Sequence, residues 1–131
     1  MLKRREILSV LSVIITLTMA QSVTAGGYNC VFPKNCYEAT GCNTERPLIV
    51  EIDESDGNKP KLVLPGMTLK AIKQIDEQPG LVSGTVSYVS NLERNTVHLL
   101  TVFEDGSARL ASHTYLNGAL DLVSRGNCEP S

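Results

Sequence analysis

The chain contains only two histidines, His98 and His113, and an Asp105-Gly106 pair lies between them. Asp-Gly suits the two central positions of a type I′ turn, where both residues need positive φ, so the pair marks a hairpin tip. With a two-residue loop, His98 faces His113 across the hairpin, with Cβ atoms about 4.5–5.5 Å apart. Two such imidazoles can bind a transition metal or share a proton. Neighbouring groups would come from Glu104, Tyr115 or Asp121.

A loop one residue longer changes this pairing. If Glu104-Asp105-Gly106 forms the loop, with the glycine as the bulge residue, His98 lies opposite Ser112 and the histidines point to opposite faces. We favour the two-residue loop because it gathers apolar side chains on one face. These are Val97, Leu99, Phe103, Ala108 and Leu110. The ordinary alternative to a metal site is that each histidine is a half-buried strand residue bonded to a hydroxyl, such as that of Thr96 or Thr114.

Four cysteines follow residue 25: Cys30, Cys36, Cys42 and Cys128. An even number in an exported chain predicts two disulfides, and neither a Cys-x-x-Cys motif nor zinc-like spacing is present. Three pairings are open. We favour Cys30 with Cys128 and Cys36 with Cys42, because the second pair encloses a plausible turn. The first bridge would make the two ends of the chain one structural unit.

The first 25 residues have the three parts of an export signal. Lys3-Arg4-Arg5 is basic, residues 7–20 are an apolar core of 14 residues, and Val23-Thr24-Ala25 is a small-residue cleavage site. The core is shorter than the roughly 20 residues of a membrane span. Arg4-Arg5-Glu6-Ile7-Leu8 also resembles a twin-arginine signal, although general secretion is favoured. We therefore expect cleavage after residue 25, no membrane span afterwards, and a periplasmic or secreted protein.

Residues 26–131 form a chain of 106 residues, which predicts a single domain. It carries 9 Lys and Arg against 13 Asp and Glu, a net charge near −4. Because nucleic-acid binding is dominated by phosphate neutralisation, this composition argues against a nucleic-acid partner. It also offers no basic amphipathic surface for anionic lipid.

Apolar and β-branched runs bounded by turn residues predict strands at residues 48–52, 61–64, 81–89, 96–104 and 107–116, with a further strand reaching residue 124. Asp56-Gly57, Pro65-Gly66 and Asn117-Gly118 mark turns. Thr68 begins one short expected helix with Leu69, Ile72 and Ile75 on its apolar face. Residues 26–47 show no periodicity, so their order should come from the disulfides. The fold class is all-β with at most this helix, as a small antiparallel barrel or a curved β-meander.

No catalytic motif is present: Gly-x-Ser-x-Gly, a phosphate-binding glycine loop and His-Glu-x-x-His are all missing. The acidic turn at residues 53–58 lacks the ligand spacing of an EF-hand. We therefore predict no enzyme and no cofactor, but a protein that binds a small ligand or a protein partner. Edge strands or the loop at residues 90–95 would provide the contact surface.

One family resemblance concerns the two ends of the mature chain. Tyr28-Asn29-Cys30 and the closing Cys128, with strands between them, resemble the frame of the bacterial inhibitors of c-type lysozyme. The Ser-x-Gly-x-x-Tyr recognition loop of those inhibitors is missing, so no site residue carries over. The resemblance implies a periplasmic inhibitor of a cell-wall hydrolase as an alternative function.

Overall fold

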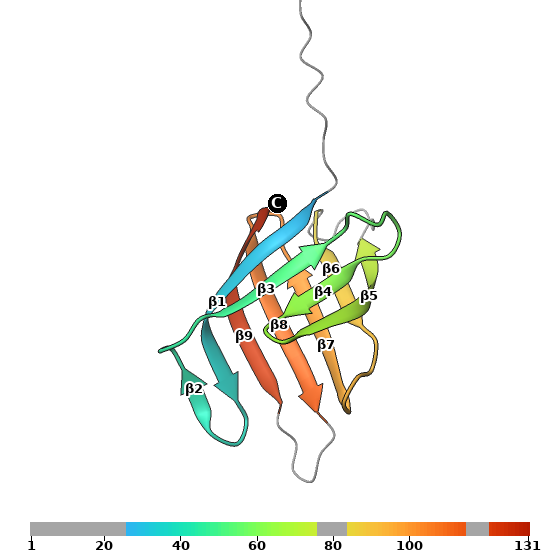
Figure 1. Ribbon diagram of the computed structural model, residues 1–131. Helices are drawn as coiled ribbons and strands as arrows, with labels where there is room; N and C mark the ends of the chain where they lie inside the picture. The colour runs from blue at the N-terminus through green and yellow to red at the C-terminus, as the bar shows by residue number, and fades with distance from the viewer. Residues whose placement is uncertain (1–25, 76–83, 115–120) are drawn as a thin grey trace, which may run out of the picture.

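The computed structural model describes residues 26–75, 84–114 and 121–131, and within them the chain forms nine strands (Figure 1). Their bounds are β1 Gly27–Tyr37, β2 Gly41–Asn43, β3 Leu48–Asp53, β4 Lys61–Leu64, β5 Met67–Ile75, β6 Val86–Ser90, β7 Thr96–Val102, β8 Ser107–Thr114 and β9 Leu122–Pro130. The expected signal segment, the start of the strand expected at residues 81–89 and the Asn117-Gly118 turn lie outside the described residues.

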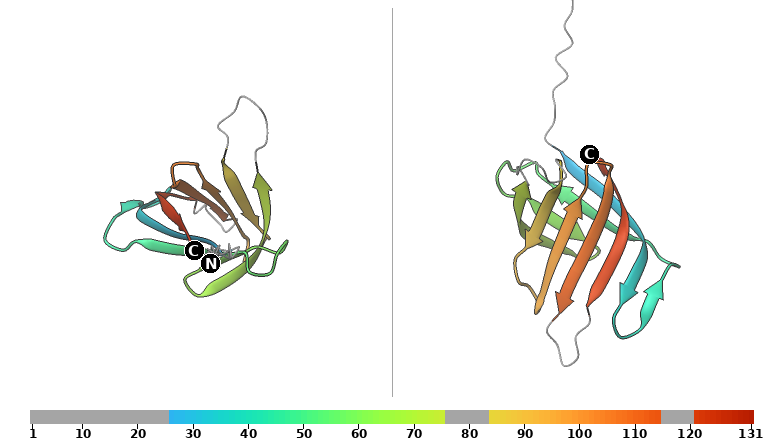
Figure 2. Two further views of the ribbon diagram at one scale, coloured as in Figure 1. Left: turned by 90° about the horizontal axis from the view of Figure 1, so that it is seen from above. Right: turned by 180° about the vertical axis from the view of Figure 1, so that it is seen from behind.

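Eight strands close into an antiparallel barrel, which confirms the first of the two predicted architectures. The order around the barrel is β1-β3-β4-β5-β6-β7-β8-β9, and β9 pairs again with β1. The view from above shows this ring (Figure 2, left). β2 pairs with β1 outside the ring. The strands expected at residues 48–52, 61–64, 96–104 and 107–116 match β3, β4, β7 and β8.

β1 closes the barrel and is bent in order to do so. Its first half pairs with β3, its second half pairs with β2, and its other edge pairs with β9 along its length. The register with β9 shifts between Val31 and Lys34, where Pro33 has no N–H to donate. Inward positions therefore run Cys30, Phe32 and then Asn35, which breaks the alternation. Residues 26–47 show no period in the sequence because this bulge interrupts the alternation, yet most of them form β1 and β2.

Side chains fill the barrel. An eight-stranded barrel is just wide enough for its interior to be packed by side chains. Phe32 and Tyr88 are the largest of the fully buried residues, and both are 0% exposed. The core consists of Cys30, Phe32, Val50, Ile52, Leu62, Leu69, Tyr88, Leu100, Val102, Ala108, Leu110 and Cys128.

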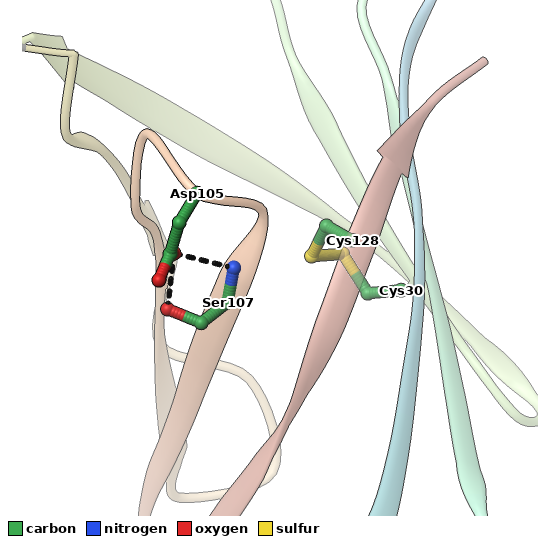
Figure 3. Close-up of a disulfide and its surroundings, with 4 residues drawn as sticks. All are labelled: Cys30, Asp105, Ser107 and Cys128. Carbon is green, nitrogen blue, oxygen red and sulfur yellow. Dashed lines mark hydrogen bonds between the residues drawn. A yellow bond between two sulfur atoms is a disulfide. The ribbon is translucent and has the colours of Figure 1, made fainter.

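The favoured disulfide pairing is confirmed. Cys30 bonds Cys128, and the two residues are direct cross-strand partners on β1 and β9 (Figure 3). Cys36 bonds Cys42 across the small β1–β2 hairpin. The first bridge joins the two ends of the domain, where Ser131 N–H also donates to the carbonyl of Gly27 over 3.2 Å.

The helix expected from Thr68 was wrong. That stretch is strand β5. Separately, none of the described segments forms a helix that could span a bilayer. Pro65 and Gly66, the latter at φ 79°, form a two-residue turn that pairs Leu64 with Met67. The turn commits the following residues to a hairpin. Leu69 then points inward, whereas Ile72 is 67% exposed on the outer face. The spacing of three residues between them therefore connects opposite faces of a strand and not one face of a helix.

The favoured register of the β7–β8 hairpin was also wrong. Phe103 N–H donates to the Ser107 carbonyl, and Gly106 N–H donates to the Phe103 carbonyl, both over 2.9 Å. Glu104-Asp105-Gly106 is therefore a three-residue loop, with Gly106 at φ 81°. Asp105 stabilises it by accepting hydrogen bonds from the Ser107 N–H at 2.8 Å and hydroxyl at 2.6 Å. The alternative register is the correct one: His98 lies opposite Ser112.

We expect the bridge at Cys30 and Cys128 to dominate stability. In the chain-entropy model a loop of about 100 residues contributes about 4.7 kcal/mol, against roughly half of that for a loop of about seven residues. Replacing Cys30 and Cys128 by alanine should therefore lower the urea midpoint of unfolding at least twice as much as replacing Cys36 and Cys42. Equal effects of the two double variants would contradict this interpretation of the barrel closure.

Candidate functional site

The structure does not bring the two histidines together. His98 is 7% exposed inside the barrel, and its Nδ1 lies 2.6 Å from Ser112 Oγ. The His113 side chain is 70% exposed on the outside, with Nδ1 3.4 Å from Asp121 Oδ2. Of the expected neighbours, only Asp121 contacts a histidine, and Tyr115 lies outside the described residues. The two imidazoles thus lie on opposite faces of the sheet, and the described residues contain no cluster of three or more metal-ligating side chains.

His98 belongs instead to a buried polar layer at the end of the barrel where β7 begins. The Ser90 hydroxyl oxygen accepts the backbone N–H of His98 at 2.9 Å. On the neighbouring strands β9 and β1, Ser124 donates to Asn35 Oδ1 at 2.6 Å, and Asn35 Nδ2 donates to the Phe32 carbonyl at 3.1 Å. No buried side-chain donor or acceptor among the described residues lacks a partner. The hydrogen bonds of this layer thus link residues of β1, β6, β7, β8 and β9 within the barrel.

A second polar group, formed by Glu54, Lys73 and Tyr88, lies toward the other end. Glu54 Oε1 accepts hydrogen bonds from the Tyr88 hydroxyl at 2.8 Å and from Lys73 Nζ at 2.7 Å. Burial first, and then the Glu54 carboxylate, raise the pKa of Tyr88 far above that of a free phenol. Tyr28 packs edge-on against the Tyr88 ring, with centroids 6.5 Å apart. This phenol stays protonated and bonded, so it is poorly suited to act as a base or nucleophile.

The outer surface offers a different kind of site. Arg109 on β8 lies directly opposite Arg125 on β9, and Arg125 lies directly opposite Lys34 on β1. Like charges in direct cross-strand register are destabilising. Among the described residues, no carboxylate lies within 4.0 Å of any of these three cationic groups. Three exposed positive charges thus stand in one row across neighbouring strands without a neutralising partner in the described chain.

A depression of about 620 Å³ opens beside this row, and we call it the arginine groove. Its lining includes Phe103, Glu104, Asp105, Arg109, Arg125 and Gly126. The Arg109 guanidinium lies 5.9 Å from the centre of the Phe103 ring, a cation–π contact that holds it on the groove wall.

Backbone geometry fixes the two sides of the arginine groove. The Gly106 carbonyl accepts the backbone N–H of Cys128 at 2.7 Å, so the β7–β8 turn is tied to the strand that carries the disulfide. A Cβ on Gly126 would lie 2.0 Å from the Val31 carbonyl oxygen, so only glycine allows β9 to approach the bulge of β1 there. Arg125 therefore precedes a rigidly packed position.

Both acidic residues of the groove lie in the β7–β8 turn, and neither carboxylate comes within 4.0 Å of a described arginine side chain. Hydrogen bonds from the Ser107 hydroxyl and N–H lower the pKa of Asp105, whose carboxylate stabilises the turn. The Glu104 side chain lies against Gly84. The guanidinium groups remain available, and guanidinium binds carboxylate and phosphate through paired N–H donors. The groove is thus suited to an oxyanion.

Sequence reasoning missed all three cationic residues of this row. Arg109 and Arg125 are 16 positions apart, and only the β8–β9 register makes them neighbours. The usable signal was that Arg109 stands between Ala108 and Leu110 in an expected strand, whereas Arg125 lies one residue beyond the expected strand end at residue 124. Comparison with protein families, curated proteins and solved structures gave no match to this chain.

The buried histidine predicts a pH-dependent stability. Burial lowers the pKa of His98 below its ordinary value of 6.5. As pH falls through 6.5 the unfolded chain binds a proton at this residue and the folded chain does not, so stability should be full above pH 6.5 and decrease below it. The measurement is the urea midpoint at pH 7.5 and 5.5.

The His98→Gln variant keeps a polar group beside Ser112 and should lose this pH dependence. His113→Gln changes the exposed histidine and serves as the matched control, in which the decrease should persist. A decrease of the same size in His98→Gln would show that another group is responsible.

Proposed function

We propose that the chain is an exported protein that acts by binding rather than by catalysis, and that it holds an oxyanion of its ligand in the arginine groove. Two intramolecular disulfides are typical of an oxidising compartment. This supports the predicted periplasmic or secreted location. The filled interior, with Phe32 and Tyr88 fully buried, favours binding on the outside of the barrel.

The observation that carries the proposal is the direct pairing of Arg109 with Arg125. Two adjacent guanidinium groups repel each other in the free protein, and a bound oxyanion would remove that repulsion. Hydrogen bonds to charged groups contribute about 1.5–3 kcal/mol each, so a forked contact to two arginines is enough for measurable binding.

The chemistry around the groove supports binding over catalysis. Ser107 is the hydroxyl nearest to a carboxylate there, and it donates to Asp105 over 2.6 Å. A general base works best with a pKa near the operating pH, whereas the pKa of Asp105 is lowered. Asp105 would therefore activate this hydroxyl poorly.

Inorganic phosphate and acetate are suitable first probes. We expect phosphate to shift the side-chain NMR resonances of Arg109 and Arg125 with saturation, and more weakly as salt is added. Arg109→Gln and Arg125→Gln should each weaken binding at least tenfold, which is about 1.4 kcal/mol. Arg94→Gln, at an exposed turn outside the groove, is the matched control and should bind as the wild type does. Equal weakening in all three variants would indicate bulk charge rather than a site.

The lysozyme-inhibitor alternative has one supporting observation. The disulfide from Cys30 to Cys128 joins the first and last strands, and this is the frame on which the resemblance rests. If inhibition is the function, the purified protein at micromolar concentration should slow the lysis of bacterial cell walls by a c-type lysozyme. Serum albumin at equal concentration is the control, and unchanged lysis would remove this alternative.

A further inference from the structure

A row of apolar side chains runs beside the cationic row on the outside of the barrel. Direct cross-strand pairing links its members in order from β5 to β9. We call them the apolar row: Ile72, Val89, Leu99, Ala111 and Val123. The view from behind shows the strands that carry them side by side (Figure 2, right).

Three large side chains of the apolar row are exposed. Ile72 is 67% exposed, Val123 49% and Leu99 39%. Contiguous exposed apolar side chains rimmed by polar groups mark interaction sites, whereas scattered ones need no explanation. The register of strands β5 to β9 places these three side chains in one row.

The two rows form one continuous surface. Ala111 follows Arg109 by two positions on β8, and Val123 precedes Arg125 by two positions on β9. Two residues along a strand correspond to about 6.6–6.8 Å, so each arginine borders an apolar side chain on its own strand. A ligand that fills only the arginine groove would leave this apolar border in water.

We propose that the arginine groove and the apolar row together dock an amphipathic helix of a partner protein, with carboxylates along one border of its apolar face. The inference rests on the proposed function and names the partner class. Charge complementarity selects the acidic border, because Lys34, Arg109 and Arg125 lack an ion-pair partner in the described part of the chain.

The geometry selects a helix over an added strand. β6, β7, β8 and β9 are each paired on both sides, so this face offers side chains and no open backbone edge. Two strand spacings from Leu99 on β7 to Val123 on β9 span about 10 Å, so about two helical turns reach both side chains before the closed barrel curves away toward Ile72. Carboxylates at i and i+4 of a helix are about 5–6 Å apart, close to the spacing of directly paired arginines. A second copy of this chain has no helix among its described residues to offer.

The test uses a synthetic 14-residue helical peptide with leucines on one stripe and glutamates along its border. The glutamate peptide should bind with saturation and shift the backbone amides of Leu99, Ala111 and Val123. A matched peptide with lysines in place of the glutamates should bind at least tenfold more weakly. Equal binding of the two peptides would overturn the proposal.

Variants separate this inference from the proposed function. Leu99→Thr and Val123→Thr keep strand-forming side chains and should weaken peptide binding at least tenfold while leaving phosphate binding unchanged. Ile49→Thr, on β3 and 58% exposed, is the matched control and should leave both unchanged. If the wild type binds phosphate but the row variants bind the peptide as tightly as the wild type does, the helix inference alone is wrong. If the wild type does not bind phosphate, the arginine groove itself is wrong as a binding site. A dimer in sedimentation that Leu99→Thr dissociates would assign the row to a second copy.

Discussion

The pairing of β1 with β9 is the constraint on which the rest of the structure depends. An open eight-stranded sheet would expose two unpaired edges, which invite aggregation, and closure removes both. β1 meets β3 on one side and β9 on the other, and the bond from Cys30 to Cys128 fixes that second contact. The bulge near Pro33 lets the strand serve both neighbours, and Gly126 lets β9 come close enough to pair there. The two ends of the chain thus hold each other in place.

Closure fixes the register of each strand, and register decides what the outside of the barrel presents. Side chains alternate between faces, so a slip of one residue in β8 would turn Arg109 inward and Leu110 outward. The three-residue loop at Glu104-Asp105-Gly106 prevents that slip, and the Asp105 carboxylate holds the loop in shape. The turn thereby keeps Arg109 on the outer face, and the separate register between β8 and β9 pairs it with Arg125. The candidate site is a consequence of the fold rather than of a local motif.

Some of this could be predicted from the sequence. Cysteine spacing favoured the disulfide pairing that forms, and turn residues located most of the described strands and left a barrel as one of two architectures, because these signals are local. Three features escaped. The bulge in β1 erased its alternation, Leu69 and Ile72 imitated a helix while lying on opposite faces, and the β7–β8 loop differed by one residue from the favoured one. The arginine groove was missed for the same reason, since cross-strand neighbours depend on register.

Polar side chains inside the barrel differ from those of the cationic row outside in whether they have a partner among the described residues. Inside, His98 bonds Ser112 and Ser124 bonds Asn35, and every fully buried side-chain nitrogen or oxygen of the described residues has a partner. Outside, the cationic row is unneutralised although residues 26–131 carry a net charge near −4. An anionic ligand is thus repelled by the molecule as a whole and attracted only within about a Debye length of the groove, roughly 8 Å at physiological salt. Short-range contacts must then supply selectivity, and the adjoining apolar side chains are placed to supply it.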